Sequence, residues 1–376
     1  MKEKLIRFFK QETVLCAAFA LAIVSMLFVH PDKEYIGYVD FRTLAILFCL
    51  MSVMAGLQKS GVFQCVAQAL LVRVRKAGQL VLILVLLCFF SSMLVTNDVA
   101  LITFVPFTLV VLGMAGPEVK TRLLIPVVVL QTIAANLGSM LTPIGNSQNL
   151  YLYGKAGLSL GDFVLLMLPY AAVSLIVIVV WSLVQSRTCH EPVQVSFGEK
   201  AGLAGNRIRL VIYGVLFALD LLTVARIIPY GATLGVTVLA LIVTDRSIFR
   251  CVDYSLLLTF VGFFIFIGNI GRLPAFSQML QEIVSGHEVL AGVAASQVIS
   301  NVPAALLLSG FTKNYPALMI GVNLGGLGTL IASMASLISY KLIVKEDGRI
   351  KGAYLRYFTA ANICFLVVLL VFTMIF

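Results

Sequence analysis

Amide and hydroxyl side chains are concentrated in one stretch of an otherwise apolar chain. Residues 138–149 read GSMLTPIGNSQN, with a proline among polar residues. Pro143 removes a backbone donor and opens a helix one turn earlier, and the nearby glycines allow the chain to unwind. The freed carbonyls can coordinate Na⁺, and the start of the following half-helix can face an anion. The alternative is a proline kink packed by small residues. We favour a site, with Thr142 and Gly145 as candidates for cation binding and Asn146 and Asn149 for substrate binding.

Two further polar clusters interrupt apolar runs, at residues 95–98 (VTND) and 299–303 (ISNVP). We expect each to be the tip of a helical hairpin that enters the membrane and returns to its starting side. Asn, Ser and Thr at such a tip can cap the exposed N–H groups of the second leg. The same groups can instead hold a substrate. The candidate substrate-binding residues are Thr96, Asn97, Ser300 and Asn301.

Of the 17 acidic residues, only Asp98 and Asp220 fall within apolar blocks. A carboxylate inside a membrane is costly, which makes it a functional hypothesis by default. Asp98 could bind Na⁺, carry a coupling proton, or cap the second leg of its hairpin. For Asp220 we favour a structural role, with Arg226 as its expected partner.

The composition of the whole chain requires a membrane. Of 376 residues, 60% are hydrophobic and 12% are charged, against about 45–50% and about 25% in soluble domains. Blocks such as 13–29, 79–95 and 357–376 are about the length that crosses a bilayer as a helix. None of them alternates as a barrel strand would. We therefore expect an all-α polytopic membrane protein in the lipid bilayer, and we exclude soluble and disordered classes.

We predict nine crossing segments and two hairpins, and the basic residues test that count. If the N-terminus is cytoplasmic, only six of the 27 Lys and Arg residues lie outside, as the positive-inside rule requires. The net charge of +10 is then a topology signal, and no nucleic-acid partner is expected. We expect the C-terminus outside and the N-terminal segment to stay as a signal anchor in a prokaryotic-type plasma (inner) membrane. The crossing segments lie near 13–30, 42–57, 120–153, 162–185, 208–225, 230–244, 254–271, 315–341 and 355–376, and the hairpins near 80–114 and 288–312.

An internal repeat organises these segments. Residues 135–153 and 322–340 are identical at seven of 19 positions, and the two hairpin tips align Asn97 with Asn301. Segments 42–57 and 254–271 correspond but run in opposite directions, so the halves are inverted repeats, which are typical of secondary transporters. The second copy of the polar break has glycines but no proline, so we expect a milder interruption there. It adds two candidates for cation binding, Thr329 and Ser333.

The predicted organisation has three parts, each half having one re-entrant hairpin and one broken transmembrane helix. Residues 1–186 form the first inverted repeat, 187–229 a cytoplasmic linker plus one unpaired span, and 230–376 the second inverted repeat. The sequence has no Ser-His-Asp set, P-loop, CxxC pair or histidine cluster. We therefore expect no enzyme, no cofactor and no transition-metal site.

The residues of the two tips and of the first break resemble those of the ion transporter superfamily. That group contains divalent-anion/sodium symporters, citrate-type carriers, the arsenite-pump membrane subunit and some sodium/proton antiporters. The resemblance covers nearly the whole chain, and it implies an elevator motion of hairpins and broken helices against a scaffold, in a homodimer. In the dicarboxylate branch the tip amides and hydroxyls contact the carboxylate, which assigns that role to Thr96, Asn97, Ser300 and Asn301. This chain departs from that branch at Asp98 and Val302, and its Asn-Asp tip looks more like the arsenite-pump branch, which exchanges arsenite for protons.

The sequence therefore predicts an ion-coupled secondary active transporter of a small anion, either a carboxylate or an inorganic oxyanion. Na⁺ or H⁺ is the expected coupling ion, with Asp98 as the candidate coupling group. Two alternatives stay open: arsenite or antimonite efflux coupled to protons, and sodium/proton antiport. A third alternative, from a different functional class, is a non-transporting membrane scaffold or a channel.

Overall fold

A computed structural model describes residues 12–72, 74–186 and 207–375. Within these ranges every regular element is a helix, and there is no strand. Six of the described helices are long and apolar enough to cross a membrane. The chain is thus an all-helical polytopic membrane protein, while the number of nine crossings stays a prediction. The six are α4 (Phe41–Lys59), α7 (Asn97–Met114), α8 (Pro117–Ser139), α10 (Leu160–Ser186), α13 (Tyr254–Gly271) and α19 (Lys351–Ile375).

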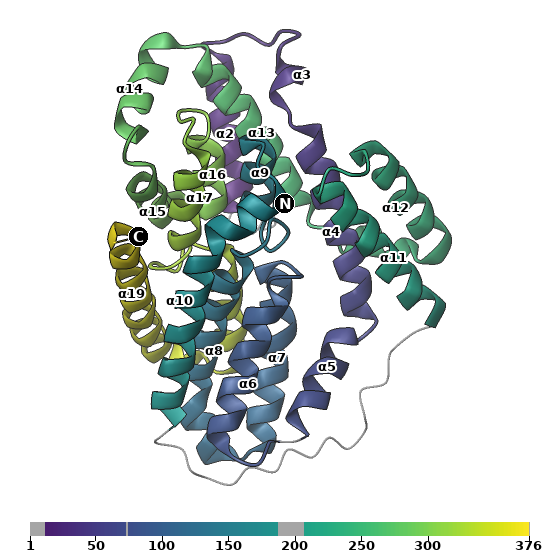
Figure 1. Cartoon of the computed structure of the whole chain (residues 1–376), viewed down its shortest axis with the longest axis vertical. Helices are drawn as coiled ribbons and strands as arrows, with labels where there is room; N and C mark the ends of the chain where they lie inside the picture. The colour runs from purple at the N-terminus through teal and green to yellow at the C-terminus, as the bar shows by residue number, and fades with distance from the viewer. Residues whose placement is uncertain (1–11, 73, 187–206, 376) are drawn as a thin grey trace, which may run out of the picture.

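The first half of the chain is centred on α6 (Ala77–Ser91), α7 and α8, at the lower end in Figure 1. These helices pack on one another and on α10, and α19 from the far end of the chain packs on α8. Leu80, Leu84 and Val128 are completely buried among them. Helix α8 is the most deeply buried of the six long helices. Its apolar side chains therefore pack closely against other helices more than against lipid.

In the second half, at the upper end in Figure 1, α15 (Glu288–Ile299) and α16 (Asn301–Leu308) pack on α17 (Tyr315–Leu324). Helices α15 and α17 approach closely at Gly321, where a side chain would begin 2.6 Å from the carbonyl oxygen of Val289. Small residues at such crossings allow membrane helices to pack backbone to backbone. Beside this group, α13 packs on α2 (Thr13–Met26).

A third group of helices flanks both halves. Helix α4 packs on α11 (Arg207–Val224) and α12 (Tyr230–Thr244). The ammonium group of Lys59, at the end of α4, lies 2.8 Å from the carboxylate of Asp245 and lowers the pKa of Asp245 to about 2. This ion pair fixes the end of α4 to the turn η1 (Arg246–Arg250) that follows α12.

Two of the predicted spans are interrupted, as the sequence indicates. Helix α8 ends at Ser139 and α9 (Ser147–Ala156) begins after the proline segment, which confirms the break. Helix α17 ends at Leu324, and α18 (Met334–Glu346) begins only after residues 325–333. The second interruption is longer than the first, so the expectation of a milder one is wrong.

The side chain of Gln297 explains the length of the second interruption. Its amide nitrogen donates to the carbonyls of Gly325 and Leu327 at 3.0 and 2.9 Å, and its oxygen accepts from the Thr329 N–H at 2.8 Å. Gly328 adopts a φ of +109°, which only glycine does easily. These bonds replace the missing helix hydrogen bonds, so an interruption without proline is stable.

Five short helical elements of the described chain fall outside the predicted segments: α3 (Tyr35–Tyr38), α5 (Val62–Leu71), α14 (Pro274–Val284) and the turns η1 and η2 (Gly348–Ile350). Helices α5 and α14 follow α4 and α13 at corresponding places in the two halves. Each is shorter than a span, so a search for span-length apolar blocks passes over it.

Candidate functional site

Each hairpin tip contacts the interruption of its own half through a backbone hydrogen bond. The Asn97 N–H donates to the carbonyl of Gly145 at 3.0 Å. The Asn301 N–H donates to the carbonyl of Ala332 at 2.9 Å. Gly145 and Ala332 occupy equivalent places in the sequence repeat. The same contact therefore positions both tips against the unwound segments.

The capping prediction holds at one tip only. Thr96 accepts from the Val99 N–H at 3.5 Å, and Asn97 accepts from the Asp98 N–H at 3.0 Å, so both cap the start of α7. Ser300 does not cap α16; its hydroxyl lies 3.4 Å from the Ala332 carbonyl, and its φ is +72°. Positive φ is unusual for serine and marks a backbone held in place by its surroundings.

Two asparagines connect the halves where the interruptions cross. The side-chain oxygen of Asn136 accepts from the Asn97 amide and from the Ser333 hydroxyl, both at 3.0 Å. Asn323, the repeat partner of Asn136, accepts from the Asn146 amide at 3.2 Å and donates to the Asn149 oxygen at 2.6 Å. The start of each second half-helix is thereby fixed to the helix that ends just before the interruption of the other half.

These bonds occupy most of the hydrogen-bonding groups in the side chains of Asn146 and Asn149, so few of these groups remain for a ligand. Asn146 also caps α9 by accepting from the Asn149 N–H at 3.0 Å. Both residues are buried, with 4% and 0% of their surfaces exposed. Their amides support the framework around the site.

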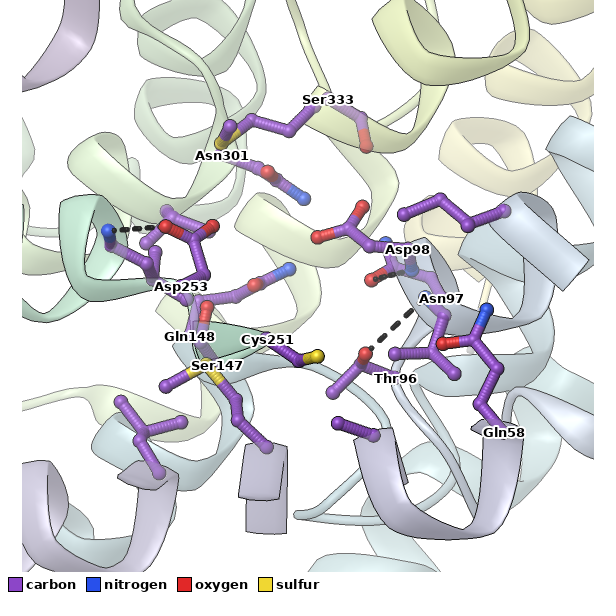
Figure 2. Close-up of a pocket in the computed structure, with 18 residues that line it drawn as sticks. Gln58, Thr96, Asn97, Asp98, Ser147, Gln148, Cys251, Asp253, Asn301 and Ser333 are labelled. Atoms are coloured by element: carbon purple, nitrogen blue, oxygen red, sulfur yellow. Dashed lines mark hydrogen bonds between the residues drawn. The ribbon is translucent and has the colours of Figure 1, made fainter. Parts of the chain in front are cut away.

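A cavity of about 180 Å³, which we call the site cavity, opens where the tips meet α4 and the start of α13. Figure 2 shows Asn97 and Asp98 on one side of it, Asp253 on the opposite side, and Asn301 with Ser333 above. The starts of α7, α9, α16 and α18 all lie at this cavity. Its polar lining consists of Gln58, Thr96, Asn97, Asp98, Ser147, Gln148, Cys251, Asp253, Asn301 and Ser333.

Five of the candidates from the sequence thus line the site cavity: Thr96, Asn97, Asp98, Asn301 and Ser333. The others lie in the segments behind it: Thr142, Gly145, Asn146, Asn149, Ser300 and Thr329. The Thr142 hydroxyl donates to the Met93 carbonyl at 2.5 Å, and the Thr329 hydroxyl to the Gln297 carbonyl at 3.1 Å. The first hydroxyl thus connects the turn after α6 to the first interruption, and the second connects α15 to the second interruption.

The sequence reasoning missed Asp253, Cys251 and Gln58 as lining residues. Asp253 caps α13 by accepting from the Leu256 N–H at 3.0 Å, as Asp40 caps α4 through Thr43. Asp40 and Asp253 precede the corresponding segments 42–57 and 254–271, but only the packing of α13 beside the tips brings Asp253 to the cavity.

The charges at the site cavity are all negative. Among the described lining residues Asp98 and Asp253 are the charged ones, and none is Lys or Arg. One carboxylate oxygen of Asp98 is buried and has no hydrogen-bond partner among the described residues. The helix starts supply partial positive charge, which favours an anion, and the carboxylates favour a cation or a proton. The cavity thus suits a cation and an anion together better than an anion alone.

The expected pairing of Asp220 with Arg226 is wrong. Asp220 is 1% exposed, and neither of its oxygens has a hydrogen-bond partner among the described residues. Arg226 donates instead to the carbonyls of Tyr153 and Gly157, at the end of α9. A helix C-terminus attracts a cation in this way, and the sequence could not indicate which neighbour Arg226 would reach.

The described residues include no group of three or more His, Cys, Asp or Glu side chains that could hold a metal ion. The site is therefore best described by its amides, hydroxyls and two carboxylates.

Comparison with known proteins decides the family. A model of the citrate transporter family, CitMHS, matches residues 9–315. The chain belongs to this family. It is 30% identical over 358 residues to an uncharacterized transporter, MJ0456, of Methanocaldococcus jannaschii, covering 94% of this chain and 95% of that protein. It is also 30% identical over 316 residues to the inner membrane protein YbiR of Escherichia coli, covering 82% of each chain.

A more distant relative is the magnetosome protein MamN of Magnetospirillum gryphiswaldense, which is 25% identical over 381 residues, covering 90% of this chain and 86% of MamN. Membership of CitMHS identifies the chain as a membrane transporter rather than an enzyme. The site cavity is accordingly the candidate for substrate and ion binding.

Proposed function

We propose that the protein is an ion-coupled secondary active transporter of a small anion, either a carboxylate or an inorganic oxyanion. The observation that carries this proposal is that the lining of the site cavity combines groups that attract an anion with groups that attract a cation or a proton. Helix starts and amides converge on it, and two carboxylates line it with no Lys or Arg among the described lining residues. The first set attracts an anion, and the second requires a cation or proton to bind with it.

In this proposal Asn97 and Asn301 contact the anion, with Thr96 beside them, and Asp98 holds the coupling ion. The unpartnered oxygen of Asp98 supports its role, because a buried carboxylate oxygen without a donor is costly unless a cation or a proton satisfies it. Asp253 already uses one oxygen as a helix cap. It therefore contributes charge to the cavity and is a less direct ligand.

The proposal includes an elevator mechanism with inverted repeats. The pairs α6–α7 and α15–α16 approach the middle of the molecule from opposite ends, which supports reading them as re-entrant hairpins (Figure 1). The site cavity lies in the seam where the tips face α4 and the start of α13. A sliding motion along that seam would carry the tips across the membrane, with α4, α11 and α12 as part of the scaffold. A homodimer built on that scaffold stays a prediction.

The localisation belongs to the same proposal. Relatives such as the inner membrane protein YbiR support a plasma (inner) membrane. The bias of the basic residues supports an N-terminus in the cytoplasm and a C-terminus outside. The site cavity, which reaches Gln58 and Cys251 beside the Lys59–Asp245 ion pair, would then open toward the cytoplasm.

Arsenite or antimonite efflux coupled to protons is a second candidate, favoured by the acidic lining. A neutral oxyacid would not be repelled by Asp98 and Asp253, whereas a polyanion without cations would be. Sodium/proton antiport is favoured by the same pair of carboxylates. These candidates differ in whether an anion binds at all.

Thermal stability of the purified full chain tests the proposal and separates these candidates. Sodium is compared with potassium at two pH values and constant ionic strength, with citrate, sulfate, phosphate and arsenite as ligands. A ligand at about 100 times its Kd stabilises a protein by about 2.7 kcal/mol. We expect a carboxylate or oxyanion to stabilise more strongly with sodium or at the lower pH. Stabilisation by sodium or pH with no effect of any ligand would contradict anion transport and favour antiport, and an effect of arsenite alone would favour efflux.

A further inference from the structure

A second cavity, which we call the far cavity, lies at the opposite end of α4 from Gln58. Its volume is about 290 Å³. Helix α9 connects the two cavities, since Ser147 and Gln148 at its start line the site cavity and Gly154 and Lys155 near its end line the far cavity. The residues that line the far cavity are Tyr38, Asp40, Arg42, Tyr151, Gly154, Lys155 and Phe264.

The net charge of the residues that line the far cavity is opposite in sign to that of the site cavity. It is lined by two cations, Arg42 and Lys155, and by one carboxylate, Asp40. The carboxylate is occupied as a helix cap, with one oxygen 3.0 Å from the Thr43 nitrogen and the other 2.6 Å from the Thr43 hydroxyl. Among the described residues neither cation forms an ion pair with a carboxylate. The far cavity therefore keeps a net positive charge, because Asp40 offsets only one of its two cations.

The side-chain contacts of both cations leave room for an acceptor. One terminal nitrogen of Arg42, Nη2, is buried and has no hydrogen-bond partner among the described residues. Among the described residues Lys155 donates only to neutral hydroxyls, those of Tyr151 at 3.1 Å and Ser309 at 3.3 Å. Buried N–H groups without an acceptor are costly, and an anion in the cavity would satisfy them. A guanidinium group is well suited to a carboxylate or oxyanion because it donates two parallel bonds.

A nearby arginine shows what an internally paired cation looks like. Arg272, at the end of α13, lies 2.6 Å from a carboxylate oxygen of Asp32 and 3.4 Å from one of Glu34. It also donates to the hydroxyl of Tyr38, a lining residue of the far cavity. Arg272 thus has carboxylate partners at this end of the molecule, whereas Arg42 and Lys155 have none among the described residues.

We propose that the far cavity is a second anion-binding site, for a small multivalent carboxylate or inorganic oxyanion held by Arg42 and Lys155. The assignment of this site to the transport path rests on the proposed function, because it takes the ligand to be of the transported class. The anion would bind at the far cavity on its way into or out of the site cavity, along α9.

The test is equilibrium binding of citrate and of inorganic sulfate to the purified full chain, measured by titration calorimetry at constant ionic strength. It is carried out with Asn97→Ala, which disables the site cavity, and then with Arg42→Gln or Lys155→Gln added. Lys313→Gln is the matched control, because Lys313 is an exposed cation near Tyr315 that does not line the far cavity. Arg42→Lys is a second variant that keeps the charge and reports whether loss of Arg42 merely unfolds the chain.

We expect Asn97→Ala to retain binding of at least one of these anions, and Arg42→Gln or Lys155→Gln to weaken that binding at least tenfold. Arg42→Lys should restore part of it, and Lys313→Gln should leave it within twofold of its parent. The inference is overturned if Asn97→Ala alone abolishes all anion binding, or if the Arg42 and Lys155 variants bind as tightly as the control. Failure of the proposed function would appear separately, as transport that is unaffected by Asn97→Ala.

Discussion

At both hairpin tips an asparagine N–H binds a carbonyl of the neighbouring interruption, at 3.0 Å for Asn97 and 2.9 Å for Asn301. The residues that follow differ: the first tip continues with Asp98 and the second with Val302. The first tip caps its helix through Thr96, and the second holds Ser300 at positive φ without a cap. The two halves therefore share a backbone frame and differ in chemistry. The tip carboxylate, Asp98, belongs to one half only, so the two tips should respond differently to equivalent substitutions.

The largest expected effect is on folding, at the glycines that face the hairpins. A methyl group on Gly138 would overlap the backbone carbonyl of Phe89, whereas one on Gly325 would meet the side chain of Ser296 at 2.6 Å. Overpacking costs about 1–3 kcal/mol and more where the backbone has to move. We expect Gly138→Ala to lower the melting temperature further than Gly325→Ala does. Gly214→Ala, with open space at its Cβ position, is the control and should be neutral.

Equal losses at Gly138 and Gly325 would show that both hairpins rest on equally rigid contacts. The comparison between the halves would then have no basis in packing.

The next effect concerns transport, at the two tip asparagines. The Asn97 amide donates to the buried oxygen of Asn136, so Asn97→Ala removes a framework bond as well as a ligand group. We expect it to abolish transport, by about 100-fold or more, and to destabilise the protein by about 1–3 kcal/mol. The Asn301 side chain lines the site cavity and makes no side-chain hydrogen bond that the described residues supply. Asn301→Ala should therefore raise KM in vesicle uptake with little change in melting temperature.

Asn97→Ala and Asn301→Ala are compared by uptake and by melting of the same preparations. The account is contradicted if Asn301→Ala destabilises as strongly as Asn97→Ala while leaving KM unchanged.

The smallest effect is expected on stability, from glycine substitutions at the two tip residues whose backbone conformations differ. Glycine adopts positive φ without penalty, so Ser300→Gly should relieve strain and stabilise the protein by about 1 kcal/mol. Thr96 has a φ of −66° and caps α7, so Thr96→Gly should change stability in the opposite direction, by a few tenths of a kcal/mol. Chemical denaturation in detergent measures both changes, and the same sign for the two would mean that the tips differ less than their dihedral angles suggest.

Much of the frame could be predicted from the sequence, because local chemistry determines it. Pro143 with its neighbouring glycines marked the first interruption, and Asn97 and Asn301 marked both tips. The remaining features depend on contacts that no local pattern contains. The second interruption extends over 325–333 because a distant residue, Gln297, binds its carbonyls.

The hydrogen-bond partners of the buried polar side chains also could not be predicted from the sequence. Asn146 and Asn149 had the right chemistry for a ligand, but the crossing of the interruptions gives them Asn323 as a partner. The position of Asp253 depends on how α13 packs beside the tips, and the partner of Arg226 depends on how α9 ends. Periodicity identifies an apolar face without indicating which neighbour a buried polar group reaches.

The central claim is that the carboxylate of Asp98 couples a cation to the anion at the site cavity. The most direct measurement is anion uptake into proteoliposomes driven by an imposed sodium or proton gradient, with Asp98→Asn compared with Asp253→Asn. Both substitutions remove one charge from the same cavity, and asparagine at position 253 can still cap α13. We predict that Asp253→Asn keeps gradient-driven uptake, and that Asp98→Asn still exchanges anion but no longer responds to either gradient. Gradient-driven uptake by Asp98→Asn at the wild-type rate, or loss of coupling in Asp253→Asn alone, would contradict the account.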